Sequence, residues 1–545
     1  MLSAKAFKRT ASIYLRPLLW AVFAIFAVLL LFRTISEELA GRLLTIRSPL
    51  NAESFVTVSF LLLLLLKSQR GQIVREKPFN LVNAKSETAV VLPSLLLLCV
   101  AAFYHSLGKP LLFDDYGHVT FASQSNWHEI LTAFYQPHPD IFFRPVGFLS
   151  YFIDFHWAHF DPFLWHSWSL VVHTLNCALA YILARQLEFA PLPSGVAAAV
   201  FAIHGTRAET VCWTDARFDV LSTLFVLLAL ISFEKYVRRT AKWWLAGSYV
   251  FVVLAICTKE AAFALPLMLI VVSLFHYGER RRHLLRIVPG VFALAAAGFV
   301  YRLWMIKGVG GYQTNGHANI LIFSAFRSAK GLLWRLWALA FFPINWSARP
   351  NITLALAMAI FLVLLAVIAA GSRVSKKRLL GALLLVLAAS VPVQHLLLIG
   401  SDLAGARILY LPMLGIALFW AAVCEAHPDR KYLAYAMSAI VLCFNLACLE
   451  GNITVWTQVA EAARSACQTF GRQIANISGP VEVTGLPSKY RGVYFLTNGF
   501  ADCVQINSGV PASRITTTAG SAASAYIYRW NEQSRTFDEM QQRVR

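Results

Sequence analysis

The sequence predicts an all-α polytopic membrane protein that ends in a small α/β domain. Of its 545 residues, 58% are hydrophobic and only 14% are charged. The mean hydropathy of +0.59 lies above the range of soluble domains. The apolar residues also form blocks about as long as a bilayer-crossing helix, which needs roughly 20 of them, and such blocks stop near residue 450.

The apolar blocks give about thirteen candidate spans. They lie near residues 18–33, 54–66, 88–106, 163–185, 195–206, 218–236, 243–258, 261–277, 287–306, 352–370, 379–399, 407–425 and 432–449. The segment 195–206 is short for a full crossing. The segment 326–343 is apolar enough to span but would break the alternation of loops, so we expect a half-buried or interfacial helix there.

Basic clusters set the predicted orientation. Lys and Arg total 48 against 28 Asp and Glu, but they lie in short clusters between apolar blocks, which argues against nucleic-acid binding. The clusters fall near the N-terminus and at 67–77, 234–242, 278–286, 372–378 and 427–431. All are predicted to lie on the cytoplasmic side, and the first span is predicted to stay uncleaved. An odd number of spans then puts residues 451–545 on the exoplasmic face.

Two segments of the first large exoplasmic loop, residues 107–162, are predicted to be helices lying flat at the membrane surface. Trp127, Ile130, Leu131 and Phe134 recur at helical spacing, and residues 146–160 repeat that pattern with many aromatic side chains. The tail, residues 451–545, predicts a helix near 453–474 and then short strands such as 492–497, separated by Gly, Pro and Ser.

Cysteine spacing indicates neither zinc nor a dense disulfide framework. The nine cysteines include no CxxC pair and no Cys/His spacing of a zinc site. Cys467 and Cys503 both fall in the tail and can pair if the compartment is oxidising. His166, His173 and Asn176 step down one helix face, which favours polar packing between helices over metal binding. No cofactor is predicted, and a divalent metal is left open.

Charged residues gather in the loops predicted to be exoplasmic. They are Asp114 and Asp115; His204, Arg207, Glu209, Asp215, Arg217 and Asp219; Lys259 and Glu260; and Asp402 and Arg407. A carboxylate in a partly dry pocket can act as a general base toward a hydroxyl, and cations stabilise a phosphate. If the backbone at Asp114 is extended, the two adjacent aspartates point to opposite sides.

Each of these residues also has a structural interpretation. Asp114 can be a helix N-cap or a solvated carboxylate, and Arg144 can fix its loop by pairing with an acid. His204 and Glu209 favour a local salt-bridged turn with Arg207 or Arg217. Arg217 can pair with Asp219 at a helix start, and Lys259 and Arg407 can be interfacial anchors.

The chain resembles the GT-C membrane glycosyltransferases, which use polyprenyl phosphate sugars. The likeness is carried by "FDDYGHV" (113–119), by the Arg-Pro pair and the His166, His173 and Asn176 pattern within 143–183, and by 202–230, "CTKEAAFALPLML" (257–269) and "ARILYLPMLGIALF" (406–419). It covers residues 88–450 and is strongest to the transmembrane O-mannosyltransferases with tetratricopeptide repeats and their bacterial relatives.

The resemblance implies a set of site residues. The catalytic Asp of the family lies in the first large exoplasmic loop as the first member of an acidic pair, here Asp114, with Asp115 beside it. Lipid-phosphate contacts fall to Arg217, Lys259 and Arg407. Arg144, His204 and Glu209 complete the candidate substrate-binding set. The chain departs from the family pattern in two extra spans, residues 1–87, and in a tail without the tetratricopeptide period.

The resulting hypothesis is a glycosyltransferase that moves a hexose or pentose from a polyprenyl phosphate to a glycan, lipid or protein acceptor on the exoplasmic face, with inversion. One alternative is a ligase or polymerase of lipid-linked glycans. Another is a transporter or flippase, against which the position of the charges at span ends counts. Sequons at 345, 351, 452 and 476 leave the endoplasmic reticulum open. The compact tail favours a bacterial inner membrane.

Overall fold

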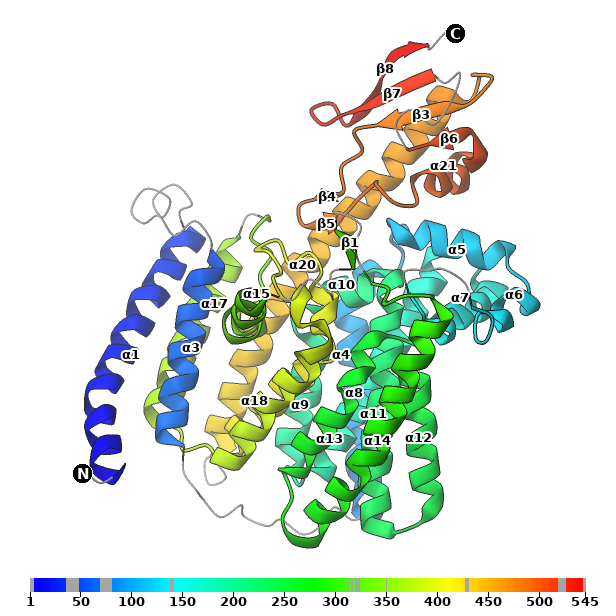
Figure 1. The fold of residues 1–545 in the computed structure, drawn as a ribbon. Coiled ribbons are helices and arrows are strands. Elements are labelled where there is room, and N and C mark those ends of the chain that lie inside the picture. Colours follow the sequence, from blue (N-terminus) through cyan, green and yellow to red (C-terminus); the bar gives the residue numbers. More distant parts are fainter. Residues whose placement is uncertain are drawn as a thin grey trace.

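A computed structural model describes most of the chain, and Figure 1 shows its arrangement. The described residues are 4–35, 49–68, 81–137, 142–311, 313–314, 317–318, 324–348, 350–426, 431–517 and 526–542. They form a helical bundle, a group of short helices at one end of it, and a small α/β tail above that same end. Buried apolar side chains form one continuous core from α1 (Ala4–Ile35) to the tail.

Among the described residues, eight helices are long and apolar enough to cross a membrane. They lie in α1, α3 (Pro49–Lys67), α4 (Leu81–Phe103), α8 (Pro162–Gln186), α11 (Arg217–Arg239), α14 (Gly278–Met305), α17 (Ile352–Gly371) and α20 (Lys431–Ile474). Four shorter apolar segments also belong to the bundle: α9 (Pro191–Ile203), α12 (Lys242–Ile256), η3 (Glu260–Ala264) with α13 (Leu265–Ser273), and α19 (Met413–Glu425).

The predicted count of about thirteen spans is not confirmed by these helices. Several predicted spans form helices too short to cross a bilayer alone, as was expected for 195–206. The segment 379–399 is divided between α18 (Lys376–Ser390) and the 3-10 turn η6 (Val391–Leu396), where Pro392 removes a backbone donor. The segment 326–343 forms α15 (Ala325–Lys330), a π turn (Gly331–Arg335) and α16 (Leu336–Phe341), and only its second half is buried.

Short helices cover one end of the bundle (Figure 1). They are α5 (Asp114–Gln124), α6 (Trp127–Thr132) and α7 (Pro145–Ala158), beside η1 (Tyr104–Ser106), α10 (Arg207–Cys212), η2 (Thr214–Ala216), η7 (Ala406–Leu409) and the β1–β2 pair (Gln313–Thr314, His317–Ala318). Asn126 and Glu129 form a reciprocal capping box that starts α6. The helices predicted near 127–134 and 146–160 are therefore present.

The helix α20 runs without a break from the bundle into the tail (Figure 1). The sequence predicts instead a span ending near 449 and a separate helix from 453, so the boundary predicted at 451 lies inside α20. Gly451 costs the helix only about 1 kcal/mol relative to Ala. Beyond it, the helix keeps an apolar face whose members, Ile453, Trp456, Val459, Ala463, Cys467 and Phe470, are buried.

The tail is a small α/β unit. Its sheet has the strand order β6-β3-β7-β8. The strand β3 (Val481–Thr484) is parallel to β6 (Ile515–Thr516) and β7 (Tyr526–Asn531), and β8 (Thr536–Gln542) is antiparallel to β7. Helix α21 (Phe500–Ser508) and the turn η8 (Ala512–Arg514) lie beside it, and a hairpin of β4 (Lys489–Tyr490) and β5 (Val493–Tyr494) faces the bundle.

A disulfide bond fixes α21 to α20. It joins Cys467 and Cys503, whose Cα atoms are 5.9 Å apart. The pairing that the sequence suggested is confirmed. The predicted strand at 492–497 is shorter than expected, because only Val493 and Tyr494 pair, and residues 495–499 turn toward the bundle.

Candidate active site

The acidic pair lies at the start of α5, directly after the loop that follows η1. Asp114 and Asp115 occupy the first turn of this helix, where negative charge is favoured by the helix dipole. The extended backbone considered for Asp114 is therefore not observed, because the backbone here is helical. The two side chains leave adjacent positions of a helix rather than opposite faces of a strand. Phe113 precedes them with a positive φ of 56°, and its ring packs against Tyr494 at 5.2 Å and Trp213 at 6.2 Å.

Asp115 is a buried anchor. Its Oδ2 accepts the backbone N–H of Leu112 at 3.1 Å, and its Oδ1 accepts the backbone N–H of Asp215 at 2.7 Å. Burial and the charge of Asp215 raise the pKa of Asp115 well above its ordinary value. Both oxygens are thus occupied in tying the start of α5 to η2, which is a structural role.

Asp114 is partly exposed and carries the more accessible carboxylate. Its Oδ1 accepts a hydrogen bond from Asn498 Nδ2 at 3.0 Å. Burial, followed by the charge of Asp215, raises the pKa of Asp114 to about 6, although Asn498, His118 and Arg407 oppose this rise. A carboxyl group with this pKa is ionised at neutral pH and binds a proton more readily than an ordinary aspartate, as a general base requires.

An ion pair between His118 and Asp215 neighbours the acidic pair. His118 Nδ1 lies 2.7 Å from Asp215 Oδ1. Burial lowers the pKa of His118, but the charge of Asp215 more than offsets this effect and the net shift is upward. The upward shift favours the protonated form of His118, whose charge acts on Asp114.

A cavity of about 420 Å³ is lined by Tyr494, whose ring packs on Phe113, the residue before Asp114. Its lining among the described residues includes four cationic side chains and one carboxylate: Arg144, Lys259, Arg302, Arg407 and Glu260. The remaining lining is mostly apolar, with Phe142, Phe263, Phe299, Val391, Ile408 and Tyr494 among its members. A cavity with cations at one part of an apolar wall suits a ligand that joins an anionic group to a hydrocarbon chain.

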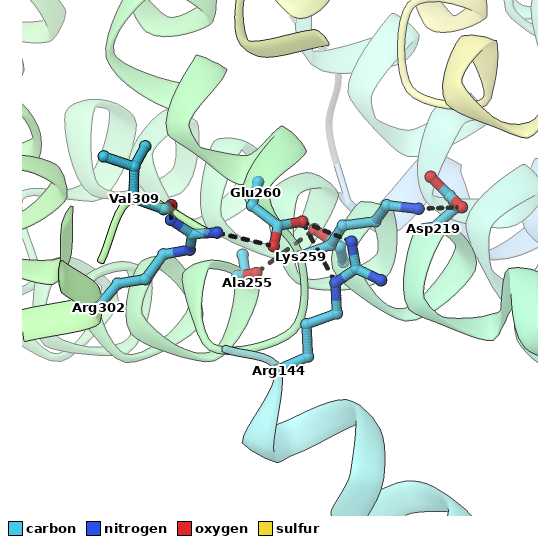
Figure 2. A network of polar contacts seen from close by, with 8 residues as sticks. Arg144, Asp219, Ala255, Lys259, Glu260, Arg302 and Val309 are labelled. Atoms are coloured by element: carbon cyan, nitrogen blue, oxygen red, sulfur yellow. Dashed lines mark hydrogen bonds and ion pairs between the residues drawn. The ribbon is translucent and has the colours of Figure 1, made fainter. Parts of the chain in front are cut away.

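Carboxylates hold the cations in place (Figure 2). Glu260 Oε2 accepts two hydrogen bonds from Arg144, at 2.8 and 3.2 Å, and its Oε1 lies 3.6 Å from Arg302. Lys259 forms an ion pair with Asp219 of α11, and burial, opposed by Asp219, lowers the pKa of Lys259. The cationic side chains are therefore pre-positioned before a ligand binds.

Arg407 connects the cavity to the acidic pair. It donates to Glu209 Oε1 at 2.6 Å and lies over the rings of Trp213 at 4.6 Å and Tyr494 at 5.4 Å. Tyr494 both lines the cavity and packs on Phe113, the residue before Asp114. The cationic cavity and the candidate base thus share one aromatic wall.

Three of the predicted binding residues, Arg217, His204 and Glu209, are absent from the described cavity lining, and Glu209 instead accepts a hydrogen bond from Arg407. Arg217 donates to Asp154 at 2.7 Å and packs on the Tyr151 and Trp165 rings, so it fixes α11 to α7 and α8. His204 is buried, with Nδ1 near Thr206 and Nε2 3.0 Å from the carbonyl oxygen of Ala340.

A Cys/His cluster is buried in the bundle. Ligand atoms of Cys99, His173 and Cys177 lie within 4.8 Å of one another. The ring of His173 is already used, because Nε2 lies 3.0 Å from the Ala202 carbonyl oxygen and Nδ1 lies 2.7 Å from the Tyr410 hydroxyl. Asn176 donates to the same hydroxyl, so this group packs helices together as the sequence predicted. Its imidazole offers no lone pair to a metal in this arrangement.

Sequence reasoning missed Asn498, Tyr494 and Arg302. Asn498 and Tyr494 belong to the tail, which was assigned no part in the site, and no local pattern connects them to Asp114. Arg302 occupies the last turn of α14, where a basic residue normally indicates only favourable interaction with the helix dipole. His118 and Asp215 lie in segments 113–119 and 202–230, which carry the family resemblance. Their pairing could not be predicted, because it depends on how these two segments meet in the fold.

Comparisons with known proteins give local sequence similarity. No family model matches the chain. It is 29% identical over 100 residues to the protein O-mannosyl-transferase TMTC1 of Mus musculus, which covers 17% of this chain and 10% of that protein. It is 25% identical over 119 residues to Tmtc1 of Drosophila melanogaster, which covers 22% and 14%. The predicted resemblance to transmembrane O-mannosyltransferases is confirmed, over a small part of these much longer relatives.

Solved structures of membrane glycosyltransferases are also similar. ArnT from Cupriavidus metallidurans bound to undecaprenyl phosphate matches with a TM-score of 0.37 and 14% identity, over 82% of this chain and 94% of ArnT. The Archaeoglobus fulgidus oligosaccharyltransferase tethered to an acceptor peptide matches with a TM-score of 0.42 and 12% identity, over 80% and 64%.

Proposed function

We propose that this chain is a membrane glycosyltransferase that moves a sugar from a polyprenyl phosphate to an acceptor hydroxyl. The observation that carries this proposal is the cavity lined by Arg144, Lys259, Arg302 and Arg407, which is also lined by Tyr494, whose ring packs on Phe113, the residue before Asp114. The cavity offers cations to a phosphate and apolar surface to the first prenyl units. Asp114 supplies the base that the acceptor needs.

The proposed reaction is a single displacement. Asp114 takes the proton of the acceptor hydroxyl, the acceptor oxygen forms a bond to the anomeric carbon, and the bond from that carbon to the phosphate oxygen breaks. The electron pair leaves with the lipid phosphate. Attack from the side opposite the leaving group inverts the anomeric configuration. The departing phosphate needs no general acid, because it is already a good leaving group.

The cations favour the transition state over the bound donor. A sugar phosphodiester carries one negative charge, whereas the departing monoester approaches two. Electrostatic stabilisation by Arg144, Lys259, Arg302 and Arg407 therefore grows as the bond breaks, and only such differential stabilisation accelerates the step. Glu260, Asp219 and Glu209 keep these side chains in position, and four cations against three carboxylates still leave one excess positive charge for the ligand. No role for a metal ion is required.

The chemistry is proposed to occur on the exoplasmic face of a bacterial inner membrane. The basic clusters near 234–242 and 278–286 lie at helix ends about one membrane thickness from Arg217 and Arg302, which supports a cytoplasmic position for those clusters. The disulfide of Cys467 and Cys503 supports an oxidising compartment for the tail.

Sugar transfer by the purified protein tests the proposal. Labelled polyprenyl phosphate sugars, hexose and pentose, are incubated with a panel of glycan, lipid and peptide acceptors. Transfer is expected with the natural chain and is expected to fall at least about 10²-fold in Asp114→Asn. Asp161→Asn is the matched control, since Asp161 caps α8 through an amide-compatible hydrogen bond to Phe163 and should retain activity.

Two outcomes contradict the proposal. Undiminished transfer by Asp114→Asn would exclude Asp114 as the general base. Transfer that requires long preassembled glycans would indicate a ligase or polymerase. The melting temperature of Asp114→Asn separates loss of the base from unfolding. The pKa of Asp114 rises from 3.8 to about 6 on folding, so any stabilisation by its proton is lost as the pH rises through this interval. Removing the charge should leave the melting temperature at neutral pH unchanged or higher.

A further inference from the structure

A loop of the tail, residues 494–499, reaches the proposed base. This loop joins β5 to α21 and carries Tyr494 and Asn498 to the start of α5. Resting on the proposed function, we infer that Asn498 is a positioning residue for Asp114, so that the tail is part of the catalytic site and not an appended domain.

The contact is a hydrogen bond with an assigned direction. Asn498 Nδ2 lies 3.0 Å from Asp114 Oδ1, and an amide nitrogen can only donate to a carboxylate. Donation fixes the rotation of the carboxylate and occupies one oxygen. The second oxygen is left to receive the proton of an acceptor hydroxyl. Such a charge-assisted bond also favours the ionised form of the base.

The backbone around Asn498 fits closely against the bundle. Gly499 has a φ of +67°, and a Cβ atom at this position would lie 2.4 Å from the carbonyl oxygen of Phe113. Gly492, with a φ of +81°, would meet the carbonyl oxygen of Asp402 at 2.2 Å in the same way. Both contacts exclude a side chain, and the one at Gly499 places the loop directly on the backbone of Phe113, the residue before Asp114.

The other end of the loop is held by α21. Cys503 of this helix is bonded to Cys467 of α20, and Asn507 donates to the Tyr116 hydroxyl of α5 at 3.4 Å. Because α20 runs from the bundle into the tail, the disulfide and the packing of α21 hold the Asn498 backbone in position relative to Asp114. The Asn498 side chain is exposed, and these contacts hold the backbone that carries it.

Several titratable and charged side chains near Asp114 also affect its pKa. Asp115 and His118 come from α5 itself, Asp215 from η2 and Arg407 from η7. On the tail side, Asp502 of α21 approaches Gly117, and Arg464 of α20 lies near Tyr116. Asn498 is the hydrogen-bond partner that the tail supplies to the carboxylate itself. Its removal should therefore make Asp114 harder to ionise.

The pH dependence of transfer by Asn498→Leu tests this role, with Asn507→Leu as the matched control. Leu has a similar volume but cannot donate. The acid limb of the kcat/KM profile is expected to move upward by roughly 0.5 to 1 pH unit in Asn498→Leu, with a several-fold loss of kcat at neutral pH. Asn507→Leu removes a docking contact to the same helix and should keep the wild-type profile. Asn498→Gln, which retains the amide, should recover part of the loss.

A wild-type profile in Asn498→Leu would overturn the inference, as would an equal shift in Asn507→Leu, which would indicate docking alone. The proposed function fails separately. Full activity of Asp114→Asn would exclude Asp114 as the base, and no transfer by the natural chain would reject the proposed function. If Asp114→Asn is inactive and the pH profile of Asn498→Leu is unshifted, only the role of Asn498 is rejected.

Discussion

Asp114 and Asp115 are neighbours in the sequence, yet the fold gives them different surroundings. Asp115 is fully buried and receives two backbone N–H groups, one of them from Asp215, whereas Asp114 is partly exposed and faces Asn498. The sequence predicts that an acidic pair opens the first large loop. It cannot predict which member is accessible, because the partners that distinguish them, Asp215 for Asp115 and Asn498 for Asp114, are 100 and 384 residues away in the sequence.

The pH dependence of transfer follows from the surroundings of Asp114. The pKa of about 6 means that the base loses its charge as the pH falls through this value. We expect kcat/KM to be level at neutral pH and to drop about tenfold per unit on the acid side of pH 6. The measurement is a pH–rate profile with protein stability checked at each point. An acid limb near 3.8, the ordinary aspartate value, would contradict this assignment.

Arg302 offers a direct test of the cationic cavity. Its partner Glu260 is also held by Arg144, so Arg302→Gln should not leave a buried carboxylate without a cation. We expect donor KM to rise about tenfold, equivalent to ~1.4 kcal/mol, because one charge-assisted contact to phosphate is lost. Arg282→Gln, at an exposed pair on the opposite end of α14, is the control. Equal donor affinity in both variants would exclude Arg302 from the site.

At the scale of elements, hydropathy predicts most bundle helices but not where they end. The apolar run stops near residue 449 while α20 continues to Ile474, because its later residues are held by packing against α21 and the sheet. Conversely, 379–399 is mostly apolar, but its α-helix ends at Ser390, two residues before Pro392. The flat helices were predictable from their own periodicity, whereas the reach of the tail loop to Asp114 depends on tertiary packing.

The disulfide is expected to stabilise the tail. Cys467 and Cys503 are 36 residues apart, and closing a loop of this size removes denatured-state entropy worth about 4 kcal/mol at 25 °C. Cys503→Ser should therefore speed proteolysis of the tail and lower its unfolding temperature. Cys443→Ser, at an exposed free cysteine in the same long helix, is the control. Equal protease resistance of Cys503→Ser and wild type would contradict this expectation.

At the scale of the whole molecule, the site and the described basic clusters near 234–242 and 278–286 occupy opposite ends of the helices that connect them. In Figure 1 the chain begins at the end of the bundle opposite the tail, and the short helices that carry the site lie below the tail. Arg302 and Arg282 are at the two ends of α14, about 30 Å apart along the helix axis, which matches the hydrocarbon thickness of a bilayer. The positive-inside pattern predicted this separation from the sequence alone.

Cysteine labelling tests the orientation. We expect a membrane-impermeant maleimide to label Ser534→Cys in the β7–β8 turn from the exoplasmic side and not Arg282→Cys, both in a Cys443→Ser background. Permeabilised membranes provide the control, because both positions should then react. Labelling of Arg282→Cys alone in sealed membranes would reverse the proposed topology.

A structure determined with bound polyprenyl phosphate tests the central claim most directly. The account predicts the phosphorus in the cavity lined by Arg144, Lys259, Arg302 and Arg407, with Asp114 facing the same space across Tyr494. A bound lipid whose phosphate lies away from all four of these cations would contradict it.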